Sequence, residues 1–145
     1  HSAHAAERIE HVDALFKHVP NFFFGNRYFQ EMTTKLAESK LVFNKSLNRD
    51  INMRFFEGLC SGSALLTDKL PELDELGFKH GVHYIGYHNK ADMLEKADYY
   101  LEAEKGREWI AASGRRLVQA KHTYLDRCNQ ILEQIKAKRG VLTNV

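Results

Sequence analysis

The chain lacks most of the features that mark specialised protein classes. It has only two cysteines, Cys60 and Cys128, which excludes a disulfide framework and a structural zinc site built on cysteine spacing. Its two prolines and nine glycines in 145 residues exclude a collagen-like or low-complexity chain. Neither sign of charge dominates, because 21 basic residues face 19 acidic ones. We therefore expect no nucleic-acid partner.

Long hydrophobic runs are also missing. No segment approaches the ~18 consecutive apolar residues that a membrane-spanning helix needs, so no integral membrane segment is expected. The first residues, HSAHAAERIEHVDALF, are polar and helical in pattern, unlike a signal peptide. We interpret both cysteines as reduced, small core residues, which indicates a cytoplasmic protein. Since the chain begins at His1, we expect a fragment of a longer protein or residues added in cloning.

What is present is an alternation of apolar runs and helical patterns in a chain of single-domain length. Short apolar runs predict strands at 21–25, 41–46, 63–68 and 82–87. Spaced apolar residues predict helices at 5–18, 26–40, 50–61 and 71–76. Strands that alternate with helices predict an α/β fold. We expect a Rossmann-like parallel sheet of about four to five strands with helices on both faces.

The remaining residues, 89 to about 139, predict a helical C-terminus in three pieces. Asn89 is the expected N-cap of the first piece and Gly106 the break before the second. Thr123 and Asp126 form a capping-box pattern ahead of the third. That last helix has its apolar residues on one stripe, made of Leu125, Cys128, Leu132 and Ile135.

Two histidine-containing groups are interpreted as structural. The spacing of His80, His83 and His88 fits no zinc pattern, so no metal site is expected. We expect His122, Tyr124 and Arg127 to form a helix junction, with Tyr124 packed and Arg127 paired with a carboxylate.

Residues that follow the strands are the best candidates for a site, because ligands of open α/β sheets bind beyond the carboxyl ends of the strands. The loop NKSLNRD after the second predicted strand supplies Lys45, Asn48 and Arg49. It leads into a helix whose N-terminal dipole favours anions, with Asp50 as the expected cap. Arg54 follows one turn later and suits bidentate phosphate contact. This combination predicts a diphosphate site.

Glu57 lies further along the same helix, beside Phe55 and Phe56. A carboxylate at this place can accept two hydrogen bonds from the adjacent hydroxyls of a ribose. The residues alone favour a solvated glutamate on the polar face of the helix.

From about Ser39 to Leu132 the sequence resembles the C-terminal, nucleotide-binding half of a GT-B glycosyltransferase of group-1 type. More narrowly, it is similar to spore maturation protein B-like glycosyltransferases. The segments that carry the resemblance are SKLVFNKS, NMRFFEGLCSGSALLTD, YIGYHNKADMLEKADYYL, the Gly114–Arg115 pair and HTYLDRCNQIL.

The resemblance implies binding of a nucleotide diphosphate sugar of UDP, GDP or dTDP type as substrate, without a metal or other cofactor. It assigns the ribose to Glu57. It implies that the diphosphate faces the remaining predicted site residues: Lys45, Asn48, Arg49, Asn52, Met53 and Arg54. The YIGY strand and the loop after NFFFG would lie near the base. Some members carry a second glutamate eight positions earlier, where this chain has Arg49. The donor-sugar contact and the stereochemical class therefore stay open.

The resemblance also implies a partner domain. GT-B enzymes have an N-terminal half that binds the acceptor and supplies any catalytic base, and residues 1–145 contain only one domain. We therefore expect a donor-binding domain of a hexosyltransferase-like enzyme that binds nucleotide weakly and does not turn over alone. The alternatives are a non-catalytic α/β nucleotide-binding or protein-interaction module and a response-regulator-like signalling domain. The latter is disfavoured because the first predicted strand lacks an acidic cluster at its end.

Overall fold

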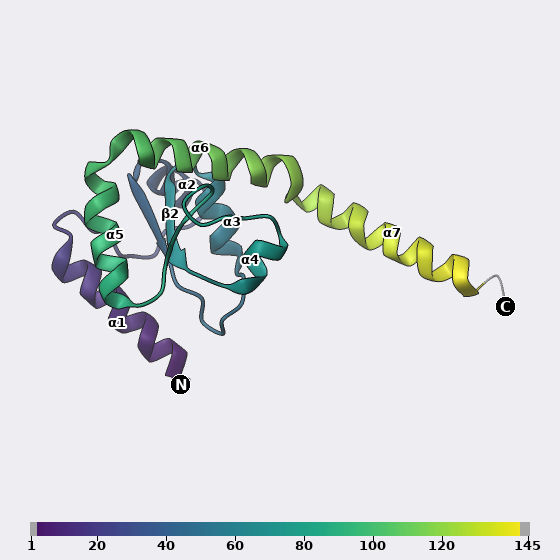
Figure 1. Ribbon diagram of the computed structural model, residues 1–145, viewed down its shortest axis with the longest axis horizontal. Helices are drawn as coiled ribbons and strands as arrows, with labels where there is room; N and C mark the ends of the chain where they lie inside the picture. Colours follow the sequence, from purple (N-terminus) through teal and green to yellow (C-terminus); the bar gives the residue numbers. More distant parts are fainter. Residues whose placement is uncertain (1–2, 143–145) are drawn as a thin grey trace.

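The computed structural model describes residues 3–142 and has an α/β architecture, as predicted (Figure 1). A parallel sheet forms the centre and helices pack on both of its faces. The elements, in chain order, are α1 (Ala3–His18), α2 (Phe29–Glu38), β1 (Leu41–Asn44), α3 (Met53–Cys60), β2 (Ala64–Asp68), α4 (Pro71–Glu75), β3 (Ile85–Tyr87), α5 (Lys90–Glu102), α6 (Glu104–Lys121) and α7 (Tyr124–Leu142).

The sheet within these residues has three strands in the order β1-β2-β3, fewer than the four to five predicted. All neighbours are parallel: Leu41 pairs with Ala64 across β1 and β2, and Leu66 pairs with Ile85 across β2 and β3. Every residue of the central strand β2 is buried. The strand predicted at 82–87 is shorter than expected and begins only at Ile85.

The strand predicted at 21–25 is wrong, because this segment lies outside the sheet. Only Phe22 packs against the hydrophobic core, while Phe23 and Phe24 are 45% and 69% exposed. A run of three phenylalanines satisfies the apolar pattern of a buried strand, but a loop that inserts one ring shows the same pattern. Apolar periodicity alone does not separate these cases.

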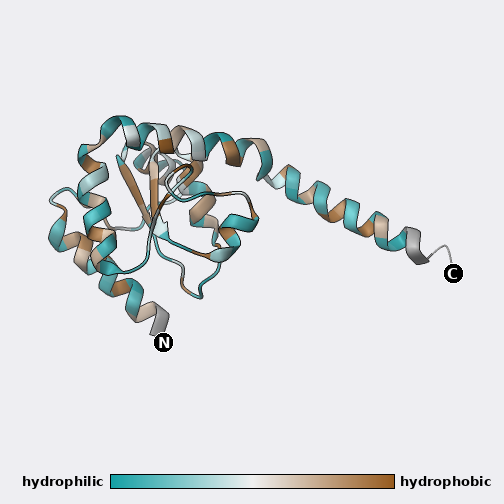
Figure 2. Cartoon of the chain, in the orientation of Figure 1, coloured by the Kyte–Doolittle hydropathy of each residue, from teal (hydrophilic) through white to brown (hydrophobic). Residues whose placement is uncertain are grey.

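Two hydrophobic clusters hold the helices against opposite faces of the sheet. One joins Leu66 and Ile85 of the sheet to Met93 of α5 and Leu15 of α1. The other joins Leu65 of β2 to its neighbours on the second face: Val42, Phe55, Leu59, Leu73, Phe78, Tyr84 and Val118. Figure 2 shows the corresponding hydrophobic colour on the strands and on the inward sides of the helices.

Helix α6 contributes to both clusters, through Ile110 on one side and Val118 on the other. Gly114, between them, lies against the main chain of His83, which precedes β3. Helix α6 therefore crosses the amino ends of the strands, as Figure 1 shows, and leaves the carboxyl ends for other elements.

Helix α1 buries only part of its apolar residues. Leu15 is in the core, but Ile9 and Phe16 of the same helix are 69% and 64% exposed. The polar residue His11 is buried instead. Cys60 and Cys128 are free, as predicted, but the prediction that they lie in the core is wrong, because both are exposed.

The caps agree with the sequence in two places and differ in two. The Asn89 side chain accepts a hydrogen bond from the Asp92 amide at 3.0 Å, and Asp126 and Thr123 cap α7 reciprocally. The predicted break at Gly106 is wrong, because that residue lies inside α6; α5 ends at Glu102, and Ala103 separates the two helices. The predicted Asp50 cap of α3 is wrong as well, because Asn52 holds that position.

Candidate functional site

A buried polar network fills the carboxyl edge of the sheet. Asp68, the last residue of β2, accepts a hydrogen bond from the Ser46 amide at 3.0 Å, and a short one from the Ser46 hydroxyl. The Thr67 hydroxyl donates to it at 3.3 Å. The ammonium of Lys45 lies 3.6 Å from the Asp68 carboxylate, and both side chains are about nine-tenths buried. Asp68 therefore ties the loop after β1 to the end of β2.

The other two strand ends join the same network. The side-chain amide of Asn44 donates to the Thr67 hydroxyl at 3.1 Å, and the Tyr87 hydroxyl donates to the main-chain carbonyl of Asn44 at 3.2 Å. Burial raises the pKa of Tyr87 far above its ordinary value, and the negative charges of Asp68 and Glu7 raise it further. The phenol is therefore a fixed hydrogen-bond donor at neutral pH.

Helix α1 covers this edge. Its Glu7 carboxylate lies 3.1 Å from the Lys45 ammonium, and the ring of buried His11 lies 5.7 Å from that of Tyr87. Lys45 is therefore held between two carboxylates, those of Glu7 and Asp68. Its charge is compensated within the chain, which makes it a structural cation in this arrangement.

The loop after this network opens to solvent and leads into α3. Asn48 and Arg49 are exposed, and Arg49 has a φ of 55°, in the left-handed region that non-glycine residues rarely adopt. The Asn52 side chain accepts a hydrogen bond from the Phe55 amide at 3.1 Å and so satisfies one of the helix's first amides. Met53 is 62% exposed beside it.

Arg54 and Glu57 form an ion pair on the first turns of α3. The Arg54 Nε atom lies 3.3 Å from a Glu57 carboxylate oxygen, and the two side chains are 45% and 33% exposed. Both side chains are therefore accessible to a ligand, and each partly neutralises the charge of the other.

The structure thus divides the predicted site residues into two groups. The exposed loop and the start of α3 hold Asn48, Arg49, Asn52, Met53, Arg54 and Glu57. Lys45 belongs instead to the buried network with Asp68 and Glu7.

Sequence reasoning missed most of that network. Thr67 and Asp68 lie at the carboxyl end of a predicted strand, where ligands of open α/β sheets bind. A carboxylate at the end of an apolar run was therefore the signal that could have identified Asp68. Glu7 and His11 carry no comparable signal, because they reach the edge from a helix far away in the sequence.

The histidines near β3 each have a structural partner. The Nδ1 atom of His80 accepts from the Gly86 amide, and that of His83 accepts from the Lys79 amide, both at 2.9 Å. His88 Nε2 lies 3.2 Å from the Lys69 ammonium. Between residues 3 and 142, no group of three or more His, Cys, Asp and Glu side chains has the arrangement of a metal site.

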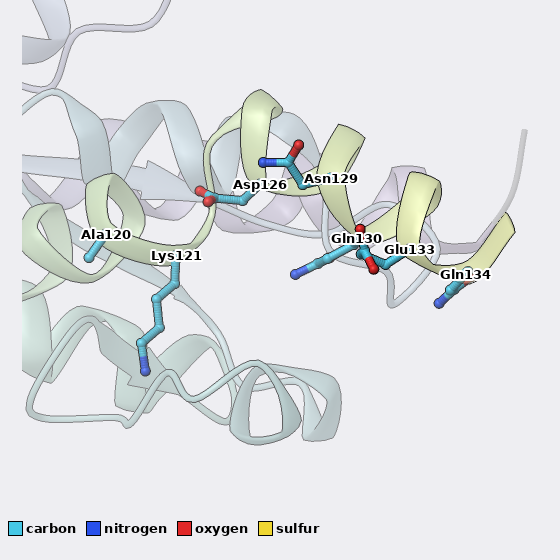
Figure 3. Close-up of a pocket in the computed structure, with 7 residues that line it drawn as sticks. All are labelled: Ala120, Lys121, Asp126, Asn129, Gln130, Glu133 and Gln134. Atoms are coloured by element: carbon cyan, nitrogen blue, oxygen red, sulfur yellow. The ribbon is translucent and has the colours of Figure 1, made fainter. Parts of the chain in front are cut away.

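A separate shallow hollow lies between the end of α6 and α7 (Figure 3). The residues that line it are Ala120, Lys121, Asp126, Asn129, Gln130, Glu133 and Gln134. It contains none of the predicted donor-site residues, and it is distant from the carboxyl edge of the sheet.

His122 connects α3 to α7 at this junction. An Arg127 guanidinium nitrogen lies 2.6 Å from its Nδ1, and its ring lies 4.7 Å from Phe78 and 6.1 Å from Phe56. The predicted junction is confirmed, but Tyr124 is 75% exposed rather than packed, and Arg127 binds His122 and Gln130 rather than a carboxylate. Burial lowers the pKa of His122, and the Arg127 charge lowers it further, while the Leu76 backbone and Asp126 raise it.

We expect this junction to weaken in acid. The folded-state pKa of His122 lies below its ordinary 6.5, so the stability of the neutral ring is present above that pH and lost as the pH falls through the folded value. His122→Gln should therefore lower the urea midpoint at about pH 8 and change it less at about pH 5. Gln130→Ala, which removes the other Arg127 partner but no titrating group, is the control and should have the same effect at both pH values. An equal effect of His122→Gln at both pH values would contradict the expectation.

Comparison with known proteins identifies the family. Residues 7–133 match the family model described as glycosyl transferase-like. Curated proteins and solved structures give no significant match. No helix within the described residues is long and apolar enough to cross a membrane. Since the family model covers most of the 145 residues, the chain belongs to the glycosyl transferase-like family.

Proposed function

We propose that this domain binds the nucleotide diphosphate of a sugar donor along the exposed start of α3. The observation that carries the proposal is the accessible Arg54–Glu57 pair, at the carboxyl side of a parallel sheet in a glycosyl transferase-like domain. Ligands of open α/β sheets bind on this side. The proposal includes the narrower likeness to spore maturation protein B-like enzymes. It also includes a cytoplasmic location, which suits two free exposed thiols.

The pair suggests how binding proceeds. A ribose diol donates two hydrogen bonds to the Glu57 carboxylate and so replaces Arg54 as its partner. The released guanidinium then turns to the diphosphate, which it binds in a bidentate manner. The first amides of α3 add positive partial charge at the same place.

Arg54 and the helix N-terminus also suit the transfer step. The nucleotide diphosphate leaves with growing negative charge, which fixed donors stabilise without a metal. Lys45 contributes only if Glu7 releases it, because Glu7 and Asp68 now compensate its charge. In this proposal a separate acceptor domain completes the enzyme, and the chain alone binds without turnover.

A nucleotide titration followed by amide chemical shifts tests the proposal. With UDP, GDP and dTDP in turn, shifts should cluster at residues 45–58 for at least one of them. Glu57→Gln should weaken that binding by at least about tenfold, because it removes a charged hydrogen-bond acceptor.

Glu38→Gln is the matched control. It removes the acid of the exposed Lys35–Glu38 pair, which has the same three-residue spacing on α2 as Arg54–Glu57 on α3. Its affinity should equal that of the unchanged protein. If millimolar UDP, GDP and dTDP all leave the shifts unchanged, the domain is instead a non-catalytic interaction module. Arg49 favours that alternative, because some family members have a glutamate at this position.

A further inference from the structure

The ammonium of Lys45 has two carboxylates beside it. It lies 3.1 Å from an oxygen of Glu7 and 3.6 Å from an oxygen of Asp68. At neutral pH the three side chains together carry one positive and two negative charges. Because one carboxylate is enough to balance the ammonium, the second can be exchanged for another anion without leaving a buried charge uncompensated.

Asp68 is the carboxylate that stays in place. Its side chain is only 11% exposed, and it accepts hydrogen bonds from the Ser46 amide and from the Ser46 and Thr67 hydroxyls. Moving it away would leave these donors buried without an acceptor, which is costly. Asp68 therefore holds Lys45 in position whatever else contacts the ammonium.

Glu7 is the carboxylate that can leave. Its side chain is 45% exposed, whereas that of Lys45 is 10% exposed. Glu7, His11 and Leu15 are spaced four residues apart and so share one face of α1. His11 and Leu15 are buried on that face and anchor the helix. The Glu7 carboxylate can therefore turn into water while α1 stays on the body, and Asp68 still compensates Lys45.

This contact lies on the side of the sheet where a ligand is expected. Lys45 directly follows β1, at the carboxyl ends of the parallel strands. The loop after it leads into α3, whose start carries Arg54 and the proposed diphosphate site. Since the Glu7 carboxylate is in contact with both the ammonium and solvent, it occupies the way by which an anion reaches Lys45.

We propose that Glu7 is an internal competitor for the anion that binds Lys45, so that α1 restrains binding of the donor. A phosphate oxygen takes the place of the Glu7 carboxylate, which turns to solvent. The exchange replaces one negative partner of Lys45 by another and keeps the charge balance of the buried network. The inference rests on the proposed function for the identity of this anion, and it adds a restraint that the Arg54–Glu57 pair does not supply.

Titration with inorganic pyrophosphate tests the competition in the absence of a ribose and a base. Glu7→Gln keeps the size of the side chain, removes its charge and leaves Lys45 paired with Asp68. This variant should lower the dissociation constant for pyrophosphate about fivefold, because an internal anion no longer occupies the site for most of the time. The amide shifts of Lys45 and Ser46 should change as pyrophosphate binds.

Glu10→Gln is the matched control on the same helix. Glu10 pairs with the ammonium of Lys90 at 3.8 Å, and both of these side chains are at least half exposed. The substitution alters the net charge by the same amount as Glu7→Gln but should leave the affinity for pyrophosphate unchanged. Equal tightening by both variants would reduce the effect to net charge and would overturn the proposal.

The remaining outcomes separate this inference from the proposed function. Pyrophosphate that binds the unchanged protein and Glu7→Gln with the same affinity, or that binds neither, would overturn the competition. If Glu7→Gln tightens pyrophosphate binding but UDP, GDP and dTDP bind to neither protein, the proposed function fails while the competition at Lys45 is supported. If a nucleotide binds both proteins equally well, the proposed function stands and the competition fails.

Discussion

Asp68→Ala is expected to lower the free energy of unfolding by about 3–5 kcal/mol, the usual cost of removing one partner of a buried ion pair. The Asp68 carboxylate accepts from the Ser46 amide and from the Ser46 and Thr67 hydroxyls, and it lies 3.6 Å from the Lys45 ammonium. Alanine leaves these donors buried without their acceptor, and it leaves Lys45 with Glu7 as its remaining carboxylate.

Urea unfolding measures this loss as a shift of the midpoint at constant slope. Asp98→Ala is the control, because Asp98 forms an exposed pair with His18 at 2.8 Å and should contribute less than about 1 kcal/mol. Asp68→Asn keeps the shape but removes the charge, so it should fall between the two. If Asp68→Ala and Asp98→Ala unfold at the same urea concentration, the network does not stabilise the edge.

The network around Asp68 shows which features of the structure can be predicted from the sequence and which cannot. The parallel α/β fold followed from the alternation of apolar runs and helical patterns, which are local properties. The caps at Asn89 and at Thr123 with Asp126 followed from short spacings for the same reason. The position of Lys45 at the end of a strand was also predictable. Its neutralisation was not, because Glu7 approaches from a helix that a different part of the sequence forms.

Other differences have similar causes. The cap of α3 was predicted at Asp50, but the helix begins where the Asn52 side chain accepts a hydrogen bond from the Phe55 amide. Cys60 and Cys128 were placed in the core because cysteine is usually buried, yet each lies on an outer helix face. The stripe of α7 was predicted correctly as a pattern. A pattern shows that a face is apolar but not what covers it.

Gly114→Ala should destabilise the domain by about 3 kcal/mol, near the upper end for overpacking. A Cβ at this position would overlap the His83 carbonyl oxygen and lie 2.8 Å from a Leu59 methyl group. The oxygen belongs to the main chain, so α6 must shift relative to α3 and to the segment before β3. This cost exceeds the gain of about 1 kcal/mol that alanine brings to a helix interior.

Gly106→Ala supplies a control in the same helix, because a Cβ at Gly106 meets nothing within 4 Å. The same substitution should there stabilise the protein by up to about 1 kcal/mol, so the two variants should move the urea midpoint in opposite directions. Helix propensity is common to both, and only the contact with His83 and Leu59 differs. Midpoints that rise in both variants would show that α6 can move away from the sheet at little cost. That result would contradict the close packing of α6 on α3, which carries Glu57.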